Sequence, residues 1–503
     1  MGHSGRRIAP LLRALPVAGL PILGAVAPGA AQDAPPSLVL EPFSLRGFDG
    51  IETAGELGRL TVPADRDDPA GGTIELAFVR LASTADQPGS AVIFLAGGPG
   101  VPGIVMGQVP VYRSLFERLR ATGDVILLDQ RGTGRSTPSL DCPAETSLAA
   151  DALADEGRAI RALLGPLERC AARLAAEGID PADYTTEASA DDVDELRRAL
   201  GAERVSLLGF SYGTELALSV ARRHPGAVDR MVLVSVRPPW AVIKLPSTYD
   251  RVIASISALA AADTAAGIPD FESSLRRVLD RLSDAPLDLT VTDERTRAPV
   301  GLRVGKVALQ AILLTGLADG RAMPGQVAMV AALDREEPEL FRREVERLYN
   351  GLGRGIGMMG VAMNCSAGAD AERQERAQAE AASALLGGIV NFLLVPEACR
   401  IAGVRDPGPG YRAPVESPAP ALFLSGSLDP NAPPAQAEEA RSGFPNAIHV
   451  VVENGSHETL PADEVQTLVA DFLGGADVSG RTVTLPPPRF PTAAEALAAS
   501  AGP

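Results

Sequence analysis

The feature that most constrains the fold is a series of six short apolar runs, most of which end in a glycine-rich or acidic turn. The runs are SAVIFLAGGPG, GDVILLDQRGTGRS, ERVSLLGFSYG, VDRMVLVSV, APALFLSGSLDP and NAIHVVVENGSH. Continuous apolar runs of this length are typical of strands that are buried on both faces, and helical stretches lie between several of them. The sequence therefore predicts an α/β fold with a mostly parallel central sheet flanked by helices.

Two insertions and a hairpin complete the predicted organisation. Residues 57–82 contain two alternating apolar runs around a turn rich in Asp, Pro and Gly, which predicts a β-hairpin. The fourth and fifth runs are separated by about 180 mostly helix-like residues, 237–418, far more than an ordinary connection. We predict that this segment is a helical cap over the strand ends, inserted between a first core part, 32–236, and a second core part with a C-terminal tail, 419–503. A smaller insertion covers about 137–190.

The N-terminus has the pattern of an export signal. Arg6, Arg7 and Arg13 precede a weakly apolar run that ends in small residues, so we expect a signal peptide, 1–31, cleaved after Ala31. The alternative is a disordered tail. The run is too short to span a bilayer, and no other stretch is typical of a transmembrane helix. These features predict a periplasmic or secreted protein with no membrane insertion.

Four cysteines occur in the chain, Cys142, Cys170, Cys365 and Cys399. An even number in an exported protein favours two disulfides, and three pairings are possible. The pairing of neighbours in the sequence, 142 with 170 and 365 with 399, is the simplest. The chain has no C-x-x-C motif and four scattered histidines, which argues against a metal site.

The third apolar run leads into the motif that carries the chemistry, LLGFSYGTELALSVARRHP. A strand, then G-x-S-x-G, then a helix predicts a sharp elbow that exposes Ser211. Gly209 and Gly213 flank it because side chains there would meet the neighbouring strand and helix. The start of a helix also favours a developing negative charge. A serine hydroxyl needs a base to become a nucleophile, so a histidine must lie close by.

The acid and base follow in the order that such an elbow requires, serine, then acid, then histidine. Asp429 follows the fifth run and His457 follows the sixth, so we predict a catalytic triad of Ser211, Asp429 and His457. His224 ends the helix of the elbow, and His449 lies within an apolar strand pattern. We interpret both as structural or surface residues.

The glycine-rich turn after the first run, LAGGPG, predicts part of an oxyanion hole. One backbone N–H is expected from this turn and the other from Tyr212, the residue after the nucleophile. We predict Gly98 for the first donor, with Gly97 as the neighbouring possibility.

These motifs resemble the α/β-hydrolase fold, and within it the family of prolyl iminopeptidases and secreted tripeptidyl aminopeptidases. The matching pieces are LTVPADRDDPAGGTIELAFVRLA, GGPG, DQRGTGRS, LLGFSYGTELAL, FLSGSLDPNAPP and ENGSH. The resemblance implies the same triad, with the serine as nucleophile, the aspartate as orienting acid and the histidine as base. It implies no metal and no organic cofactor. The two cysteine pairs also resemble the secreted branch.

The sequence departs from the family pattern at two places. Ala96 stands where the family usually has a histidine before Gly-Gly-Pro-Gly. Ser366 and Ala367 follow the cap cysteine, where the secreted aminopeptidases usually place an acidic residue that meets the free amine of the substrate. The first acids after this point are Asp370 and Glu372, which we therefore name as the candidate substrate-binding carboxylates.

The expected function is that of an exported serine hydrolase that cleaves an amide or ester bond through an acyl-enzyme. We expect an aminopeptidase that acts on peptide N-termini. The alternatives are a carboxylic-ester hydrolase or lactonase on the same scaffold, and a catalytically silent scaffold that binds a ligand. The partner is then a small peptide or ester substrate. The net charge of −17 argues against nucleic acid as a partner.

Overall fold

The computed structural model describes residues 37–499 except 69–70, 144–147, 354 and 369. The predicted signal peptide, 1–31, lies outside the described residues. Within the described ranges, the helices are all too short or too polar to cross a bilayer.

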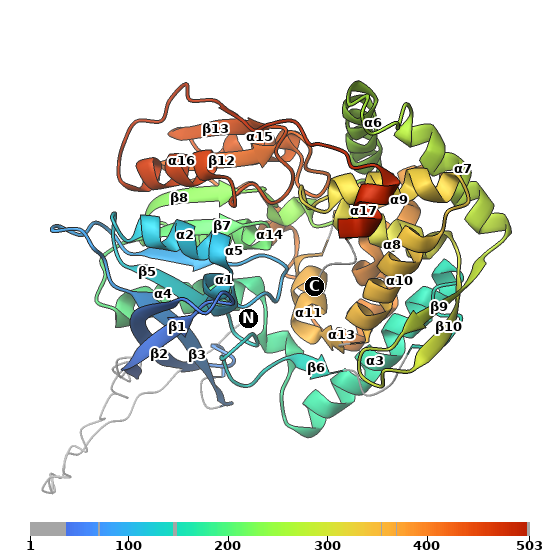
Figure 1. Ribbon diagram of the computed structural model, residues 1–503. Coiled ribbons are helices and arrows are strands. Elements are labelled where there is room, and N and C mark those ends of the chain that lie inside the picture. Colours follow the sequence, from blue (N-terminus) through green and yellow to red (C-terminus); the bar gives the residue numbers. More distant parts are fainter. Residues whose placement is uncertain (1–36, 69–70, 144–147, 354, 369, 500–503) are drawn as a thin grey trace, which may run out of the picture. The chain divides into compact units, whose positions relative to one another are not determined.

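A ten-stranded sheet forms the centre of the fold (Figure 1), in the order β1-β2-β3-β5-β4-β7-β8-β12-β13-β14. The first four strands in this order pair antiparallel, and every later pair is parallel. The six predicted runs form β4, β5, β7, β8, β12 and β13, so the mostly parallel α/β architecture is confirmed. The strands are β1 (Leu38–Arg46), β2 (Glu52–Pro63), β3 (Thr73–Leu81), β4 (Val92–Leu95), β5 (Val125–Asp129), β7 (Val205–Phe210), β8 (Val228–Val234), β12 (Ala421–Gly426), β13 (Ala447–Glu453) and β14 (Val483–Thr484).

Helices cover both faces of this sheet because the side chains of its buried strands alternate between two hydrophobic cores. Phe94 and Leu127 pack with α2 (Pro110–Leu119) and α16 (Asp463–Leu473) on one face. Ile93 and Ile126 belong to the core on the other face. That core also contains residues of α4 (Thr186–Ala199), α5 (Tyr212–Arg223) and α15 (Pro434–Arg441). The strands are therefore held from both sides, and their carboxyl ends form a rigid edge.

The long segment between β8 and β12 is mostly helical and has a hydrophobic core of its own. It contains α6 (Pro246–Ala262), α7 (Phe271–Asp284), α8 (Lys306–Gly316), α9 (Met323–Asp334), α10 (Glu339–Leu352), α12 (Ala371–Ala381), the 3-10 helix η3 (Gly387–Leu394) and α14 (Pro409–Arg412). A hairpin of β9 (Leu287–Thr292) and β10 (Pro299–Val304), which the sequence analysis did not predict, lies among them. The C-terminal helix α17 (Ala493–Ala499) packs against α9 and α10 (Figure 1).

Two disulfides stabilise the junction of the two insertions, and both join the pairs that are neighbours in the sequence. Cys142 of β6 (Asp141–Pro143) is bonded to Cys170 of α3 (Glu156–Ala176). Cys365 of α11 (Met358–Ala367) is bonded to Cys399 of α13 (Pro396–Ala402). Helices α3, α11 and α13 share one hydrophobic core with the sheet, so this part of the long insertion packs on the hydrolase core.

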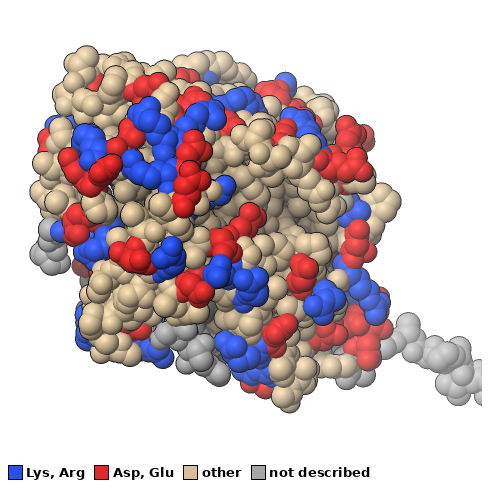
Figure 2. Space-filling view, turned by 90° about the vertical axis from the view of Figure 1, so that its right-hand side faces the viewer, with Lys and Arg blue, Asp and Glu red and all other residues tan. Residues whose placement is uncertain are grey.

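The surface that carries the inserted helices shows no large area of one charge. Figure 2 shows basic and acidic side chains mixed across this face. Many of them form short ion pairs within one helix, as Arg342 does with Glu339 and Glu346 on α10.

Candidate active site

Ser211 occupies a strained turn between β7 and α5. Its backbone has φ 53° and ψ −119°, a conformation that non-glycine residues rarely adopt. The turn is tight because the strand and the helix pack closely at both flanking glycines. A Cβ at Gly209 would lie 2.5 Å from the carbonyl oxygen of Gly213, and a Cβ at Gly213 would overlap the carbonyl oxygen of Leu95. The two glycines therefore allow the elbow that the sequence predicts, with Ser211 at its tip.

A chain of hydrogen bonds connects the three predicted triad residues. The Ser211 hydroxyl lies 3.0 Å from Nε2 of His457, and Nδ1 of His457 lies 2.8 Å from Oδ2 of Asp429. The residues follow β7, β12 and β13, whose carboxyl ends lie at the same edge of the sheet. Side chains separated by more than 200 residues in the sequence are thus within hydrogen-bond distance.

Asp429 is fully buried and has a hydrogen-bond partner for each oxygen. Its Oδ1 accepts from the backbone N–H groups of Asn431 and Ala432 at 2.8 and 2.9 Å, while Oδ2 accepts from His457. Burial alone would raise the pKa of Asp429. The opposite charge and hydrogen bond of the imidazole, together with the two backbone bonds, hold the pKa below its ordinary value instead. Asp429 therefore stays charged and can orient and stabilise an imidazolium at His457.

The backbone of His457 is also held firmly. Its N–H donates to the carbonyl of Ala318 at 3.1 Å, and its carbonyl accepts from the Ser235 hydroxyl at 2.6 Å. The imidazole lies beside the ring of Phe210, with 5.4 Å between the centroids. These contacts fix the ring between Ser211 and Asp429 and leave little rotational freedom.

The predicted oxyanion donors come from the turn after β4 and from the first residue of α5. Gly97 and Gly98 line a cavity beside Ser211. Tyr212 is the first residue of α5, and among the described residues no acceptor meets its N–H. The Tyr212 side chain is fully buried, with its hydroxyl 3.1 Å from that of Thr186, so only its backbone is available to a ligand.

The cavity beside Ser211 has a volume of about 350 Å³ and is lined by both the hydrolase core and the inserted segment. The core contributes Ser211, His457 and the glycine turn, while α8, η3 and the chain before α6 contribute most of the opposite wall. Arg237, Lys244 and Glu458 are the charged lining residues besides the histidine. A volume of this size suits a small substrate.

The predicted substrate-binding carboxylates do not line this cavity. Asp370 caps the start of α12, where its side chain accepts from the N–H of Arg373 at 2.7 Å. Glu372 lies in the first turn of the same helix. The cavity instead contains Lys244 and Glu458, which the sequence analysis did not name as site residues. Glu458 could have been found, since it follows the predicted base directly, but Lys244 has no motif around it.

The remaining described histidines have structural partners. His224 lies 2.8 Å from Asp191 of α4. His449 of β13 forms a second chain of this type, with Nδ1 2.5 Å from Glu438 and Nε2 3.0 Å from the Ser425 hydroxyl. Ser425 is fully buried inside β12, so no substrate carbonyl can reach it. Among the described residues, no group of three His, Cys, Asp or Glu side chains is arranged to hold a metal ion.

Comparisons with known proteins agree with this architecture. Residues 90–253 match the family model described as alpha/beta hydrolase fold, and residues 392–482 match the model described as TAP-like protein. These two matches confirm the α/β-hydrolase fold and the resemblance to the tripeptidyl aminopeptidase family.

Two curated relatives and one solved structure illustrate the similarity. Serine protease Hip1 of Mycobacterium tuberculosis is 33% identical over 184 residues, which cover 35% of this chain and 35% of that protein. Tripeptidyl aminopeptidase of Streptomyces coelicolor is 33% identical over 197 residues, which cover 37% of this chain and 35% of that protein. The alignments thus span about a third of each relative's length. Proline iminopeptidase of Mycobacterium smegmatis matches with a TM-score of 0.40 at 19% identity, over 82% of this chain and 97% of that chain.

Proposed function

We propose that this α/β-hydrolase is a serine hydrolase that cleaves an amide or ester bond through an acyl-enzyme. The observation that carries the proposal is the chain of hydrogen bonds from Ser211 through His457 to Asp429. Ser211 and His457 line the cavity, so the serine end of this chain faces the space for a substrate. This geometry is what nucleophilic catalysis by a serine requires, because the hydroxyl must give its proton to a base held in place by a third group.

In the proposed reaction, Oγ of Ser211 attacks the substrate carbonyl while its proton passes to Nε2 of His457. Asp429 holds Nδ1–H and stabilises the charge that forms on the ring. The N–H groups of Gly98 and Tyr212 stabilise the negative oxygen of the tetrahedral intermediate. Nε2 then gives its proton to the leaving amine or alcohol, and a water molecule activated by the same nitrogen releases the acid product.

The proposed substrate is a short peptide with a free N-terminus. Two observations support this class. One is the similarity to tripeptidyl aminopeptidase, and the other is that Glu458 is the single carboxylate among the described residues of the cavity wall. A buried ammonium needs such a carboxylate. A second candidate is an ester or lactone substrate, which has no ammonium to bind. It is favoured because Asp370 and Glu372 do not line the cavity and because Ser366 and Ala367 stand where the family usually has an acidic residue.

We also propose that the protein is exported to the periplasm or secreted. The two disulfides support this location, because disulfides persist in oxidising compartments and are rare in the cytosol.

The experiment that tests the reaction uses purified protein and paired substrates. Alanyl p-nitroanilide with a free amine is compared with its acetylated form and with p-nitrophenyl butyrate, and Ser211→Ala is the blank. Turnover that depends on Ser211 supports a serine hydrolase, and a strong preference for the free amine supports an aminopeptidase. Activity on esters or blocked amines alone would move the assignment to the ester class. Turnover that survives in Ser211→Ala would refute the proposed nucleophile.

A further inference from the structure

Lys244 lies in the cavity wall in the chain that precedes α6, where its main chain is fixed on both sides. Its backbone N–H donates to Oδ1 of Asn391 at 2.9 Å, and Nδ2 of Asn391 donates to its carbonyl at 2.9 Å. A backbone amide can only donate and a carbonyl can only accept, so the orientation of the Asn391 amide is determined. Asn391 also lines the cavity, in a non-helical kink of η3. This double hydrogen bond fixes the main chain of Lys244 in the wall of the cavity that Ser211 and His457 also line.

The ammonium of Lys244 has no ion pair and no hydrogen bond with any other described residue, in contrast to the other charged groups of the wall. Arg237 donates to Glu215 through Nε at 2.9 Å and through Nη2 at 2.6 Å. Glu458 lies 3.5 Å from Arg321. Burial and the nearby Arg237 lower the pKa of Lys244 to about 8, which leaves the ammonium mostly charged at neutral pH. Lys244 is half-buried in the cavity wall, where a cation without a protein partner is suited to a negative ligand.

The uncharged polar groups around Lys244 also present donors. Nη1 of Arg237 donates to Oδ1 of Asn364 at 2.8 Å, and a guanidinium can only donate. The Asn364 oxygen is therefore occupied, and its NH₂ group remains for a ligand. Asn431 has the same arrangement, because the hydroxyl of Tyr249 is bonded to its Oδ1. Asn364 and Asn431 both line the cavity with Lys244, so this wall offers one cation and two amide donors.

We infer that this wall is a subsite for a carboxylate of the substrate, bound by the ammonium of Lys244 with help from the NH₂ groups of Asn364 and Asn431. The inference names a charge class for the substrate of the proposed hydrolase and rests on that function for its kinetic test. Two sources carry this group, namely an acidic side chain on the acyl part and the free C-terminal carboxylate of a short peptide. A charge-assisted hydrogen bond in a partly dry cavity discriminates between a carboxylate and its amide by about 10- to 100-fold.

The kinetic test uses substrate pairs that differ by one charge. For the acyl side, glutamyl p-nitroanilide is compared with glutaminyl p-nitroanilide, and for the leaving side, trialanine is compared with trialanine amide. We expect kcat/KM to favour the acid by about 10- to 100-fold in one of the two pairs, and that pair identifies the source. In Lys244→Met this ratio falls to about one, whereas Lys244→Arg keeps a preference for the acid.

The chain offers a matched control because it contains two lysines, Lys244 and Lys306. Lys306 is exposed at the start of α8 and does not line the cavity, so Lys306→Met keeps both the activity and the acid preference of the wild type. A purely structural role for Lys244 would lower kcat/KM for acid and amide alike and leave their ratio unchanged. That result would overturn the inference, as would a wild-type ratio near one in both pairs.

A binding measurement separates failure of this inference from failure of the proposed reaction. Two acid–amide pairs, N-acetyl-glutamate α-amide with N-acetyl-glutamine α-amide and trialanine with trialanine amide, are titrated into Ser211→Ala and into Ser211→Ala with Lys244→Met, and binding is followed by ligand-observed NMR. Tighter binding of the acid in one pair that disappears with Lys244→Met supports the subsite even if no substrate is turned over. Equal binding of acid and amide to Ser211→Ala in both pairs overturns it, whether or not the enzyme assay succeeds.

Discussion

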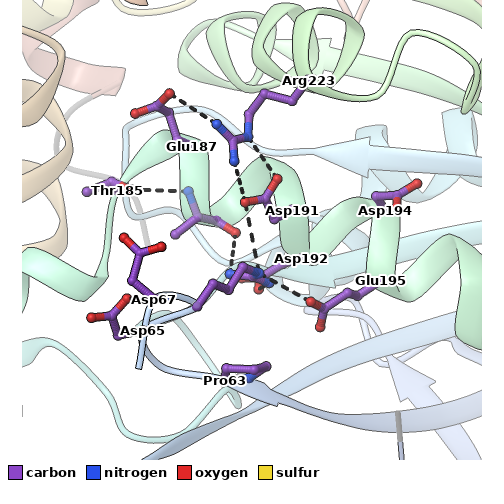
Figure 3. Close-up of polar contacts among 12 residues, drawn as sticks. Pro63, Asp65, Asp67, Thr185, Glu187, Asp191, Asp192, Asp194, Glu195 and Arg223 are labelled. Atoms are coloured by element: carbon purple, nitrogen blue, oxygen red, sulfur yellow. Dashed lines mark hydrogen bonds and ion pairs between the residues drawn. The ribbon is translucent and has the colours of Figure 1, made fainter. Parts of the chain in front are cut away.

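A buried ion pair connects the loop after β5 to helix α4, and changing one of its partners tests how much this pair contributes to the free energy of unfolding. Arg131 donates to both oxygens of Asp192, through Nε at 2.7 Å and Nη2 at 2.6 Å, and neither side chain is more than 1% exposed. Arg66 donates to the same carboxylate at 2.6 Å. Figure 3 shows Asp192 on the same helix as Asp191 and Glu195, within this cluster of polar contacts. One carboxylate thus serves two guanidinium groups.

The variant Asp192→Asn removes the negative charge and replaces one acceptor oxygen with an NH₂ group. That group would point its hydrogens toward the donors of Arg131 and Arg66. Changing one partner of a buried ion pair costs about 3–5 kcal/mol, because the other charge stays buried without compensation. Unfolding entropy is about 2 cal/mol/K per residue, so for a chain of this length the melting temperature falls by about 3–5 °C.

The assay is calorimetric or fluorescence-based thermal unfolding at pH 7, with Glu187→Gln as the matched control. Glu187 lies on the same helix and pairs with Arg223 at 3.2 Å, but its side chain is 39% exposed. Exposed pairs contribute about 0–1 kcal/mol, so the control shifts the melting temperature by about 1 °C or less. Equal shifts in the two variants would refute the reasoning. The double variant Arg131→Met with Asp192→Leu should recover part of this stability, because neither position then carries a charge and Arg66 keeps its ion pair with Glu195 at 3.2 Å.

Three further predictions concern the elbow, a buried carboxyl and a disulfide. Gly213→Ala should abolish turnover and lower the melting temperature, because its Cβ would overlap a carbonyl of β4, whereas Gly226→Ala meets nothing within 4 Å and should do neither. Burial raises the pKa of Asp129 to about 6, a value that carbon NMR can measure. The protonated carboxyl therefore contributes about 3 kcal/mol to the free energy of unfolding below pH 4, and this contribution is lost as the pH rises through 6. In the double variant Cys365→Ser with Cys399→Ser, the free energy of unfolding should fall by about 4 kcal/mol, because the unfolded chain is no longer restricted by a loop with a sequence separation of 34. Thermal unfolding would measure this loss.

The strands and the hydrogen-bonded triad could be predicted from the sequence because their signals are local. A continuous apolar run marks a strand that is buried on both faces, and the turn after it lies at a known edge of the sheet. Ser211, Asp429 and His457 each follow such a run, so their proximity follows from the order of the strands. The structure brings these three side chains together as the sequence predicts.

The first strand and the hairpin of the insertion were missed for a different reason. Strand β1, Leu38–Arg46, is an exposed edge strand with mostly exposed side chains, so it lacks the apolar run that marked the others. Strands β9 and β10 do alternate, with Val291, Leu302 and Val304 buried, but they are short and lie between strongly helical stretches. The alternation on both sides of the TDERTR turn is the sequence signal of this hairpin.

The cavity wall could not be predicted because tertiary contacts alone determine it. Asp370 and Glu372 were chosen by their distance along the chain from a cysteine, yet helix capping uses Asp370 instead. Lys244 and Asn391 are 147 residues apart and are joined by two hydrogen bonds between the side-chain amide of Asn391 and the backbone of Lys244. No periodicity or motif connects such positions, so only the folded insertion shows which of its residues line the cavity.

The described residues include two hydrogen-bonded sets of serine, histidine and carboxylate, and only one of them lies at a cavity. The distances in Ser425–His449–Glu438 resemble those of the candidate site, but Ser425 lies inside a strand with no exposed surface. Ser211 differs in its strained turn, in the free N–H of the next residue and in the adjacent cavity.

Reactivity should therefore follow access and oxyanion donors rather than the hydrogen bonds alone. A fluorophosphonate probe should label Ser211 stoichiometrically and leave Ser425 unmodified, as peptide mass spectrometry would measure, and Ser211→Ala should remove all labelling. Ser425→Ala is the matched control and should label like the wild type. Label on Ser425, or label that persists in Ser211→Ala, would mean that exposure and backbone donors do not distinguish the two serines. In that case the proposed nucleophile would have to be abandoned despite its geometry.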